Sequence, residues 1–167
     1  MNTKTETGFT LLELLLSIAI LSLVASLAVP SFNQLIEGNK LKIAVETLKS
    51  DLMFARSETM KQNMNLRIDL TKSRDSWCYG INDDNTQCDC GKADSCGLKV
   101  VNGQLFQGIK LDAADDTTFD FRRGTAVAMG ATLSSANYAA RVVVSTSGRI
   151  RICSPDQTKK LGGYDDC

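Results

Sequence analysis

One apolar run near the N-terminus constrains this 167-residue chain more than any other feature. Twenty-one residues separate Gly8 from Pro30, and Glu13 is the only charged residue among them. As a helix they would extend about 30 Å, the thickness of the hydrocarbon core of a bilayer. A carboxylate inside such a core costs a few kcal/mol, so Glu13 is expected to be there for a partner.

Two simpler interpretations of this run are a secretory signal peptide and a plain membrane anchor. A signal peptide needs a basic start, a short apolar core and a small-residue cleavage site. Here Lys4 is offset by Glu6, the run is long, and residues 25–28 resemble a cleavage site only loosely. A plain anchor explains the length, but it explains neither Glu13 nor the glycine that precedes Phe9.

The segment Gly8-Phe9-Thr10-Leu11-Leu12-Glu13 resembles the processing site of type IV prepilins, as does Pro30 at the end of the run. In that family a membrane-embedded prepilin peptidase cuts after the glycine on the cytoplasmic side and N-methylates the new N-terminus. The resemblance implies a leader at residues 1–8 and a transmembrane and filament-core helix at residues 9–29. Glu13 would then pair with the Phe9 amine of a neighbouring subunit, because mutual attraction offsets the desolvation of both charges.

Residues 30–64 are expected to continue the helix and to lie on a folded domain. From residue 31 onward, apolar side chains recur at steps of three and four, which places them on one helical face. These are Leu41, Val45, Leu48, Leu52 and Ala55. The segment at residues 54–63 also resembles the helix end of the GspH/FimT branch of minor pilins and pseudopilins.

Beyond residue 64 the apolar period becomes two, as in half-buried strands. The alternating residues are Leu66, Ile68 and Leu70; Phe119 and Phe121; Val142 and Val144; and, after a turn at Ser147-Gly148, Ile150 and Ile152. We expect residues 65–167 to form an antiparallel β-sheet domain with one face against the helix. The predicted fold class is α+β, and the resemblance implies the type IV pilin fold.

The six cysteines lie between residues 78 and 167, outside the helical part. The anchor and the type IV N-terminus favour an oxidising compartment for this domain, where disulfides persist. Fifteen pairings are possible, and a bond between Cys153 and Cys167 is favoured because it would close the polar C-terminal tail. The other four cysteines would form two bonds that hold a polar loop at residues 82–97; they are Cys78, Cys88, Cys90 and Cys96.

Zinc and a redox-active thiol pair remain alternatives for the cysteines of this loop, although their spacing is not that of paired zinc ligands. The chain has no histidine, which excludes a histidine metal site and a Ser-His or Cys-His catalytic pair. The carboxylates of Asp115 and Asp116 are paired only within a polar, turn-like run. We therefore expect no enzyme activity, no metal and no cofactor.

A net charge of zero conceals a basic segment in the C-terminal third of the chain. Between Phe121 and Pro155 there is no acidic residue and there are five arginines. Such a cluster is typical of a surface that binds polyanions, with an affinity that falls as the salt concentration rises. If residues 149–152 form a strand, Arg149 and Arg151 project from its solvent face about 7 Å apart, after a turn at Gly148. An ordinary exposed strand face is the simpler interpretation of this pattern.

The string Gly148-Arg149-Ile150-Arg151 resembles the DNA-binding motif of FimT-type minor pilins of natural transformation. It implies that a pilus subunit captures extracellular double-stranded DNA, without sequence specificity, for uptake. Arg141, Lys159 and Lys160 join the expected site on charge and proximity. The implied location is the inner membrane, by a single pass with a periplasmic domain, and then the surface pilus among other pilin subunits. The alternative is a structural minor pilin or type II secretion pseudopilin that primes filament assembly without binding DNA.

Overall fold

The computed structural model describes residues 10–73, 76–83, 86–155 and 159–167. The chain divides into two compact units, Met1–Ile36 and Glu37–Cys167. Helix α1 (Leu11–Gln62) contributes to both units and continues through Pro30, as the sequence predicts. Proline in a helix interior removes one backbone hydrogen bond.

In the first unit α1 presents apolar side chains that the described part of the chain leaves exposed. Their exposed fractions range from 77% for Leu11 to 37% for Ile36. The most apolar 18-residue window of the helix has a mean hydropathy of 2.4. This part of α1 is therefore long and apolar enough to cross a membrane.

In the second unit one face of α1 is fully buried. The side chains of Leu41, Val45, Leu48, Leu52 and Ala55 are at most 1% exposed, and they are the residues that the three-and-four spacing selects. The amphipathic half of the helix predicted from the sequence is confirmed.

The C-terminus of α1 is fixed by local backbone geometry. Asn63 has a φ of 54°, in the left-handed region, and the N–H of Met64 donates to the carbonyl of Thr59 at 3.3 Å. This arrangement satisfies a carbonyl of the last turn and reverses the chain, and asparagine tolerates the left-handed region better than most residues.

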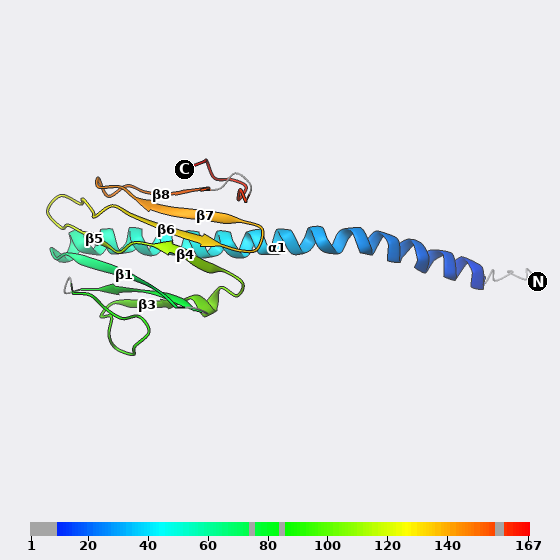
Figure 1. Ribbon diagram of the computed structural model, residues 1–167, viewed down its shortest axis with the longest axis horizontal. Coiled ribbons are helices and arrows are strands. Elements are labelled where there is room, and N and C mark those ends of the chain that lie inside the picture. The colour runs from blue at the N-terminus through cyan, green and yellow to red at the C-terminus, as the bar shows by residue number, and fades with distance from the viewer. Residues whose placement is uncertain (1–9, 74–75, 84–85, 156–158) are drawn as a thin grey trace, which may run out of the picture. The chain divides into compact units, whose positions relative to one another are not determined.

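Two antiparallel four-stranded sheets follow the helix (Figure 1). Sheet A has the order β3-β2-β1-β5, and sheet B has the order β4-β6-β7-β8. The strands of sheet A are β1 (Leu66–Lys72), β2 (Trp77–Asn82), β3 (Lys99–Asn102) and β5 (Thr117–Phe119). Those of sheet B are β4 (Lys110–Ala114), β6 (Met129–Ser134), β7 (Ala139–Val144) and β8 (Ile150–Cys153). A short 3-10 helix, η1 (Gly103–Leu105), precedes β4.

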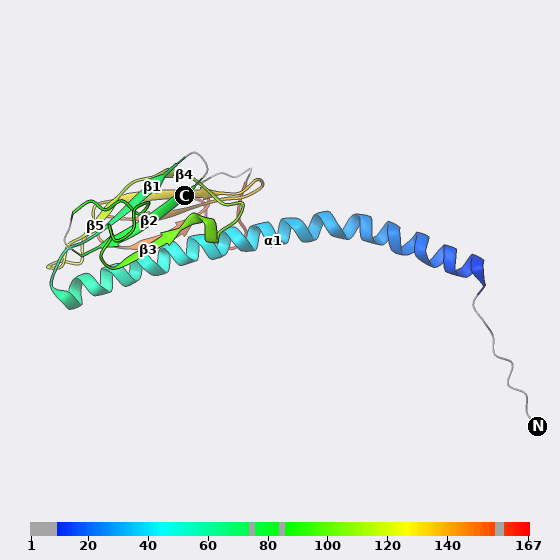
Figure 2. The same ribbon diagram turned by 90° about the horizontal axis from the view of Figure 1, so that it is seen from below.

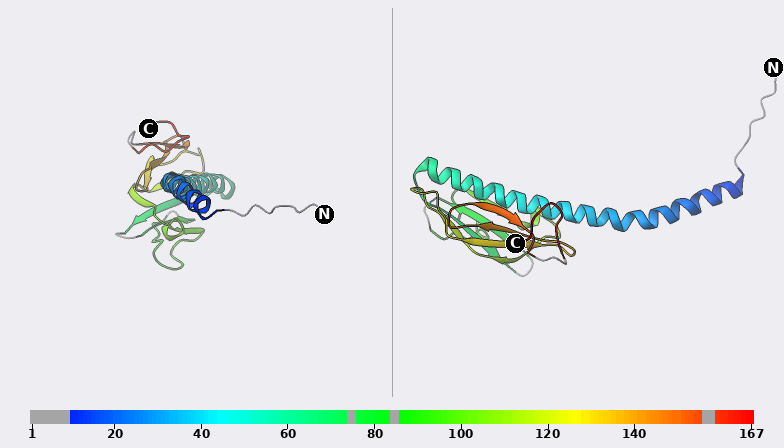
Figure 3. Two further views of the ribbon diagram at one scale, coloured as in Figure 1. Left: turned by 90° about the vertical axis from the view of Figure 1, so that its right-hand side faces the viewer. Right: turned by 90° about the horizontal axis from the view of Figure 1, so that it is seen from above.

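Both sheets pack against the same side of residues 37–62 of α1 (Figures 2 and 3). Alternate strand residues complete the core: Ile68 from β1, Tyr79 from β2, Leu133 from β6 and Val142 from β7 are at most 1% exposed. Each sheet therefore has an inner face on the helix and an outer face that points away from it. The α+β architecture expected from the sequence, a long helix packed on antiparallel strands, is confirmed.

Sequence and structure differ in detail at two strand ends. Strand β5 ends at Phe119, and Phe121 lies in a turn where the Asp120 carboxylate accepts the N–H groups of Arg122 and Arg123. Ile150 and Ile152 face inward as predicted, but they are only partly buried because β8 is the edge strand of sheet B.

Candidate nucleic-acid interface

The β7–β8 hairpin places two of the predicted arginines on one face. In the strand register Arg151 lies opposite Val143, Arg141 lies opposite Cys153, and Ile150 lies opposite the fully buried Val144. Because side chains alternate along a strand, Arg141 and Arg151 both point to the outer face of sheet B. Arg141 is the diagonal neighbour of Arg151, at about 7–8 Å for such a pair.

Arg149 immediately precedes β8, two residues before Arg151, and both side chains are exposed. Arg151 belongs to an edge strand and Arg149 to the turn before it, so a bulky ligand can approach from the side. All three arginines thus lie on one hairpin, Arg141 and Arg151 on the outer face of sheet B and Arg149 in the turn that leads into β8.

Gly148 fixes the turn that positions Arg149. Its N–H donates to the Ser145 carbonyl at 2.8 Å, and the Ser145 N–H donates to the Arg149 carbonyl at 2.9 Å. Gly148 has a φ of 75°, and a Cβ at this position would collide with the carbonyl of Gly124. Both the positive φ and the close backbone approach require glycine.

The arginines of the hairpin lack carboxylate partners within the described part of the chain. None of the ion pairs there includes Arg141, Arg149 or Arg151. Arg67 on sheet A is the contrast, because it donates to Asp69 and Asp116 at 2.6 and 3.1 Å. Hydrogen bonding to Asp69 is the main cause that raises the pKa of Arg67.

Arg141 is half-buried against β6. Gly130 lies beneath its guanidinium, and a Cβ at Gly130 would collide with the arginine. The Nε of Arg141 is buried and has no hydrogen-bond partner among the described residues. Packing rather than ion pairing therefore holds this side chain on the outer face.

Lys159 and Lys160 lie at the opposite end of β7 from Arg149. The Lys159 carbonyl accepts the N–H of Ala139, the first residue of β7, and Lys160 bridges to the same residue. Lys160 is also paired with Asp166 at 2.7 Å. Six strand residues separate the two ends by about 17 Å, so these lysines lie far from Arg149, although Arg141 is only two residues from Ala139.

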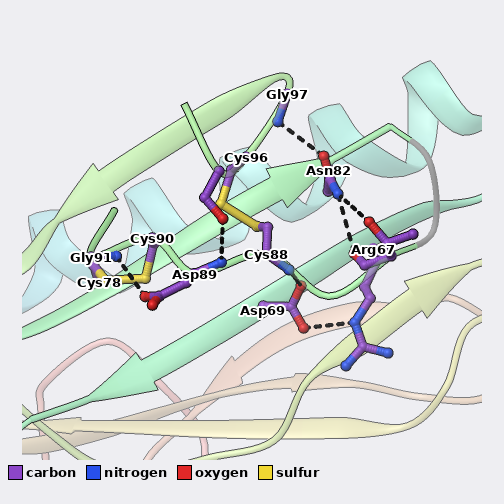
Figure 4. Close-up of a disulfide and its surroundings, with 12 residues drawn as sticks. Arg67, Asp69, Cys78, Asn82, Cys88, Asp89, Cys90, Gly91, Cys96 and Gly97 are labelled. Atoms are coloured by element: carbon purple, nitrogen blue, oxygen red, sulfur yellow. Dashed lines mark hydrogen bonds and ion pairs between the residues drawn. A yellow bond between two sulfur atoms is a disulfide. The ribbon is translucent and has the colours of Figure 1, made fainter. Parts of the chain in front are cut away.

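The six cysteines form three disulfides, which are Cys78–Cys90, Cys88–Cys96 and Cys153–Cys167. The last is the tail bond favoured from the sequence, and the other two hold the predicted loop over β2 (Figure 4). All six sulfur atoms are thus covalently paired, and the disulfides expected from the sequence are confirmed. The described residues contain no group of three or more acidic or cysteine side chains arranged to hold a metal.

The disulfide loop is also anchored by hydrogen bonds to sheet A. Asp69, 2% exposed, accepts the Cys88 N–H at 2.9 Å and the Arg67 Nε at 2.6 Å (Figure 4). Gly80 of β2 lies directly beneath the Cys88–Cys96 bond, where a Cβ would collide with the Cys96 sulfur. Close approach of the disulfide to the sheet therefore requires glycine here.

The N-terminal site lies only partly within the described residues. Gly8 and Phe9 lie outside them, whereas Glu13 is in the first turn of α1. The Glu13 N–H donates to Thr10 Oγ1 at 3.3 Å. Thr10 and Glu13 thus have the spacing of a helix capping box, which gives Glu13 a local role that the sequence interpretation did not include.

Arg56 is the site residue that sequence reasoning did not assign. It lies on α1 beneath the Gly148 turn, where a Cβ on Gly148 would be 3.0 Å from its Nε. The sequence offers no periodic signal for this contact, because it depends on the packing of β8 against the helix.

Comparison with known proteins gives two family matches. The family described as Type II transport protein GspH matches residues 44–148, which is more than half of the chain, and the prokaryotic N-terminal methylation motif matches residues 3–29. The GspH match ends at Gly148, so Arg149 and Arg151 follow it. Among curated proteins no match was found.

Two solved structures share the fold. The type IV minor pilin FimU of Pseudomonas aeruginosa is 21% identical with a TM-score of 0.52, over 72% of this chain and 95% of FimU. The minor pseudopilin EpsH from the Type 2 Secretion System of Vibrio cholerae is 13% identical with a TM-score of 0.50, over 71% of this chain and 99% of EpsH. With its methylation motif, long apolar helix and two-sheet domain, the chain belongs to the GspH family and is a minor type IV pilin or pseudopilin.

Proposed function

We propose that this minor pilin binds extracellular double-stranded DNA for uptake in natural transformation. The observation that carries the proposal is the group of three hairpin arginines, Arg141, Arg149 and Arg151, which have no carboxylate partner among the described residues. Guanidinium groups are planar donors that match phosphate geometry, and unpaired ones need not break an ion pair to bind it.

Binding through this group is expected to be independent of base sequence. The exposed arginines project from a strand rather than from a helix that fits the major groove, so they contact phosphates. The single tryptophan, Trp77, is 5% exposed and Tyr79 is 1% exposed, so neither supplies a stacking platform for single-stranded bases. Lys159 and Lys160 would add a second, more distant phosphate contact.

The N-terminal part delivers this surface to a filament. We propose cleavage between Gly8 and Phe9 by a prepilin peptidase, methylation of Phe9, and pairing of Glu13 with the Phe9 amine of a neighbouring subunit. Before assembly, a single pass through the inner membrane would hold the disulfide-bonded domain in the periplasm. Several subunits along one pilus raise the weak affinity of each by avidity.

The DNA proposal is tested with the full chain in nonionic detergent micelles and a fluorescent duplex at low salt. The wild type is expected to bind, with an affinity that falls steeply with salt. The variant Arg149→Gln/Arg151→Gln is expected to lose binding without a change in melting temperature. A charge-matched control is Lys61→Gln/Lys92→Gln, whose two lysines are exposed and ion-paired elsewhere.

Unchanged binding by the double arginine variant would refute the assignment of these residues. No binding by the wild type would favour the structural alternative, a pilin or pseudopilin that primes assembly. That alternative is supported by the GspH match, which accounts for the domain without Arg149 and Arg151.

The role of Glu13 is tested by two substitutions that separate its charge from its place in the capping box. Glu13→Gln keeps the hydrogen-bonding side chain at this position but removes the charge, and Glu13→Ala removes both. If pairing with the Phe9 amine governs assembly, both variants fail to enter filaments. Normal incorporation of Glu13→Gln, with failure of Glu13→Ala, would assign Glu13 to helix capping instead.

A further inference from the structure

Arg56 has an unusual environment within the second unit. Its guanidinium lies against the two glycine-containing turns that flank it, with Nε 3.0 Å from a Cβ built on Gly148 and Nη2 3.6 Å from one built on Gly124. The side chain is half-buried. Any larger residue at Gly148 would displace the guanidinium, so the space that it occupies exists because Gly148 has no side chain.

This guanidinium has no partner among the described residues. Its Nε is buried and makes no hydrogen bond, and Arg56 takes part in none of the ion pairs. A buried donor without an acceptor is unfavourable, and most native proteins avoid it. Packing holds the Arg56 guanidinium in this position although its buried N–H lacks an acceptor in the described chain. An acceptor supplied by a bound ligand would explain why this arrangement is kept.

A groove joins Arg56 to the proposed DNA site. It has a volume of about 450 Å³, and Arg56 and Arg149 lie on its wall together with Met53, Met60 and Ile150. The remaining lining residues are serines, and no carboxylate lines the groove. Two cations beside apolar groups in a carboxylate-free groove attract an anion more strongly than the same cations in open solvent.

We propose that Arg56 and Arg149 together hold one backbone phosphate of the DNA duplex in this groove. The inference rests on the proposed function and extends it, since it adds a helix residue to a site otherwise built from β7 and β8. Arg56 is the preorganised member because its turn contacts fix it, and Arg149 is the exposed member that closes on the phosphate. The duplex then crosses the molecule at the Gly148 end of the hairpin.

The test compares Arg56→Gln with the wild type for binding of a fluorescent duplex over a range of salt concentrations, with the full chain in nonionic micelles. Arg56→Gln is expected to raise Kd for the duplex by about three- to tenfold. The fall of the log association constant with log salt concentration is expected to become less steep, by about one unit of slope. Arg56→Lys keeps the charge and is expected to restore the slope. Lys61→Gln is the matched control, because Lys61 projects about 140° away around the same helix.

The outcomes separate this inference from the function on which it rests. If Arg149→Gln/Arg151→Gln abolishes binding while Arg56→Gln keeps the wild-type Kd and slope, the inference is wrong and the proposed function stands. If the wild type does not bind DNA, the proposed function fails, and so does the contact of this groove with a DNA phosphate. The phosphate measurement described next then decides whether the groove binds an anion at all.

A second measurement uses inorganic phosphate as the probe and does not depend on DNA. At matched ionic strength, replacing chloride by phosphate is expected to raise the melting temperature of the wild type and of Lys61→Gln more than that of Arg56→Gln. Equal rises in all three proteins would overturn the anion site. Melting temperatures in chloride show whether Arg56→Gln is folded, and Arg56→Lys provides the readout if it is not.

Discussion

The outer faces of the two sheets differ in how far the rest of the chain covers them. On sheet A, the loop between β2 and β3 covers β2, so that all six residues of this strand are buried. On sheet B, Arg141, Val143 and Arg151 of β7 and β8 remain at least partly exposed. The helix covers the inner face of each sheet in the same way.

Polar groups on the two faces differ accordingly. On sheet A, the Asp69 carboxylate accepts hydrogen bonds from Arg67 and from the backbone N–H of Cys88 in the loop. On sheet B, the Nε of Arg141 is buried without a partner in the described chain. Polar groups that are fully hydrogen-bonded contribute stability, whereas a buried donor without a partner costs free energy in the folded chain.

The largest effect is expected from uncovering sheet A. Cys88→Ser/Cys96→Ser removes the disulfide that lies on Gly80 and releases the loop. The free energy of unfolding should fall by about 2–4 kcal/mol, the usual range for a native disulfide. Chemical denaturation of the full chain in micelles measures it, and a loss below about 0.5 kcal/mol would contradict the covering role of the loop.

The next effect concerns the turn of sheet B. Gly148→Ala introduces strain at a φ of 75° and a collision with the Gly124 carbonyl, so a loss of about 1–3 kcal/mol is expected. Gly163→Ala is the matched control, because Gly163 has a φ of 95° but no atom within 4 Å of a Cβ. Equal losses in the two variants, measured by thermal unfolding, would show that backbone strain alone matters and that the Gly124 contact does not.

A paired substitution tests the contrast between the two faces directly. Asp69→Asn places an amide against the donors of Arg67 and Cys88 and should cost about 1–3 kcal/mol. Arg141→Gln breaks no hydrogen bond or ion pair of the described chain, so its cost should stay within about 0.5 kcal/mol. If Arg141→Gln destabilises as much as Asp69→Asn, the outer face of sheet B is structural and not reserved for a ligand.

The smallest effect is a pH dependence at the start of the second unit, at Glu37. Hydrogen bonds from Ser135 and then from the backbone of Asn137 lower the pKa of Glu37 below its ordinary value of 4.5. A lowered pKa in the folded state contributes stability above pH 4.5 that is lost as pH falls through the folded-state pKa. The side chain is solvent-accessible, so the contribution is small; Glu37→Gln should remove it, giving a slightly shallower loss of melting temperature from pH 5 to pH 3.

The helix and the β7–β8 hairpin were predictable because their patterns are local. The spacing of Leu41, Leu48 and Leu52 defines a helical face, and Val142, Val144 and the glycine turn define a hairpin. Strand β2 was not predicted, because it is buried on both faces and carries no apolar–polar alternation.

The site was predictable to the same extent. Arg151 follows from strand periodicity, Arg141 joins it through the register of β7 and β8, and Arg149 lies in the turn just before β8. Lys159 and Lys160 are near in sequence but lie at the far end of β7, because the chain folds back along Ala139. Arg56 is distant in sequence and reaches the site only through tertiary packing, which no local pattern encodes.

The Cys153–Cys167 bond also determines how the hairpin responds to force. A ligand held at Arg149 and Arg151 on a moving filament would pull on β8, an edge strand with a single hydrogen-bonded neighbour. The far end of β8 is Cys153, which is covalently joined to the last residue, while the adjacent Ser154 bridges to Asp166. Separation of β8 from β7 at that end must therefore also displace the C-terminal tail. The hairpin is expected to open first at its Gly148 end.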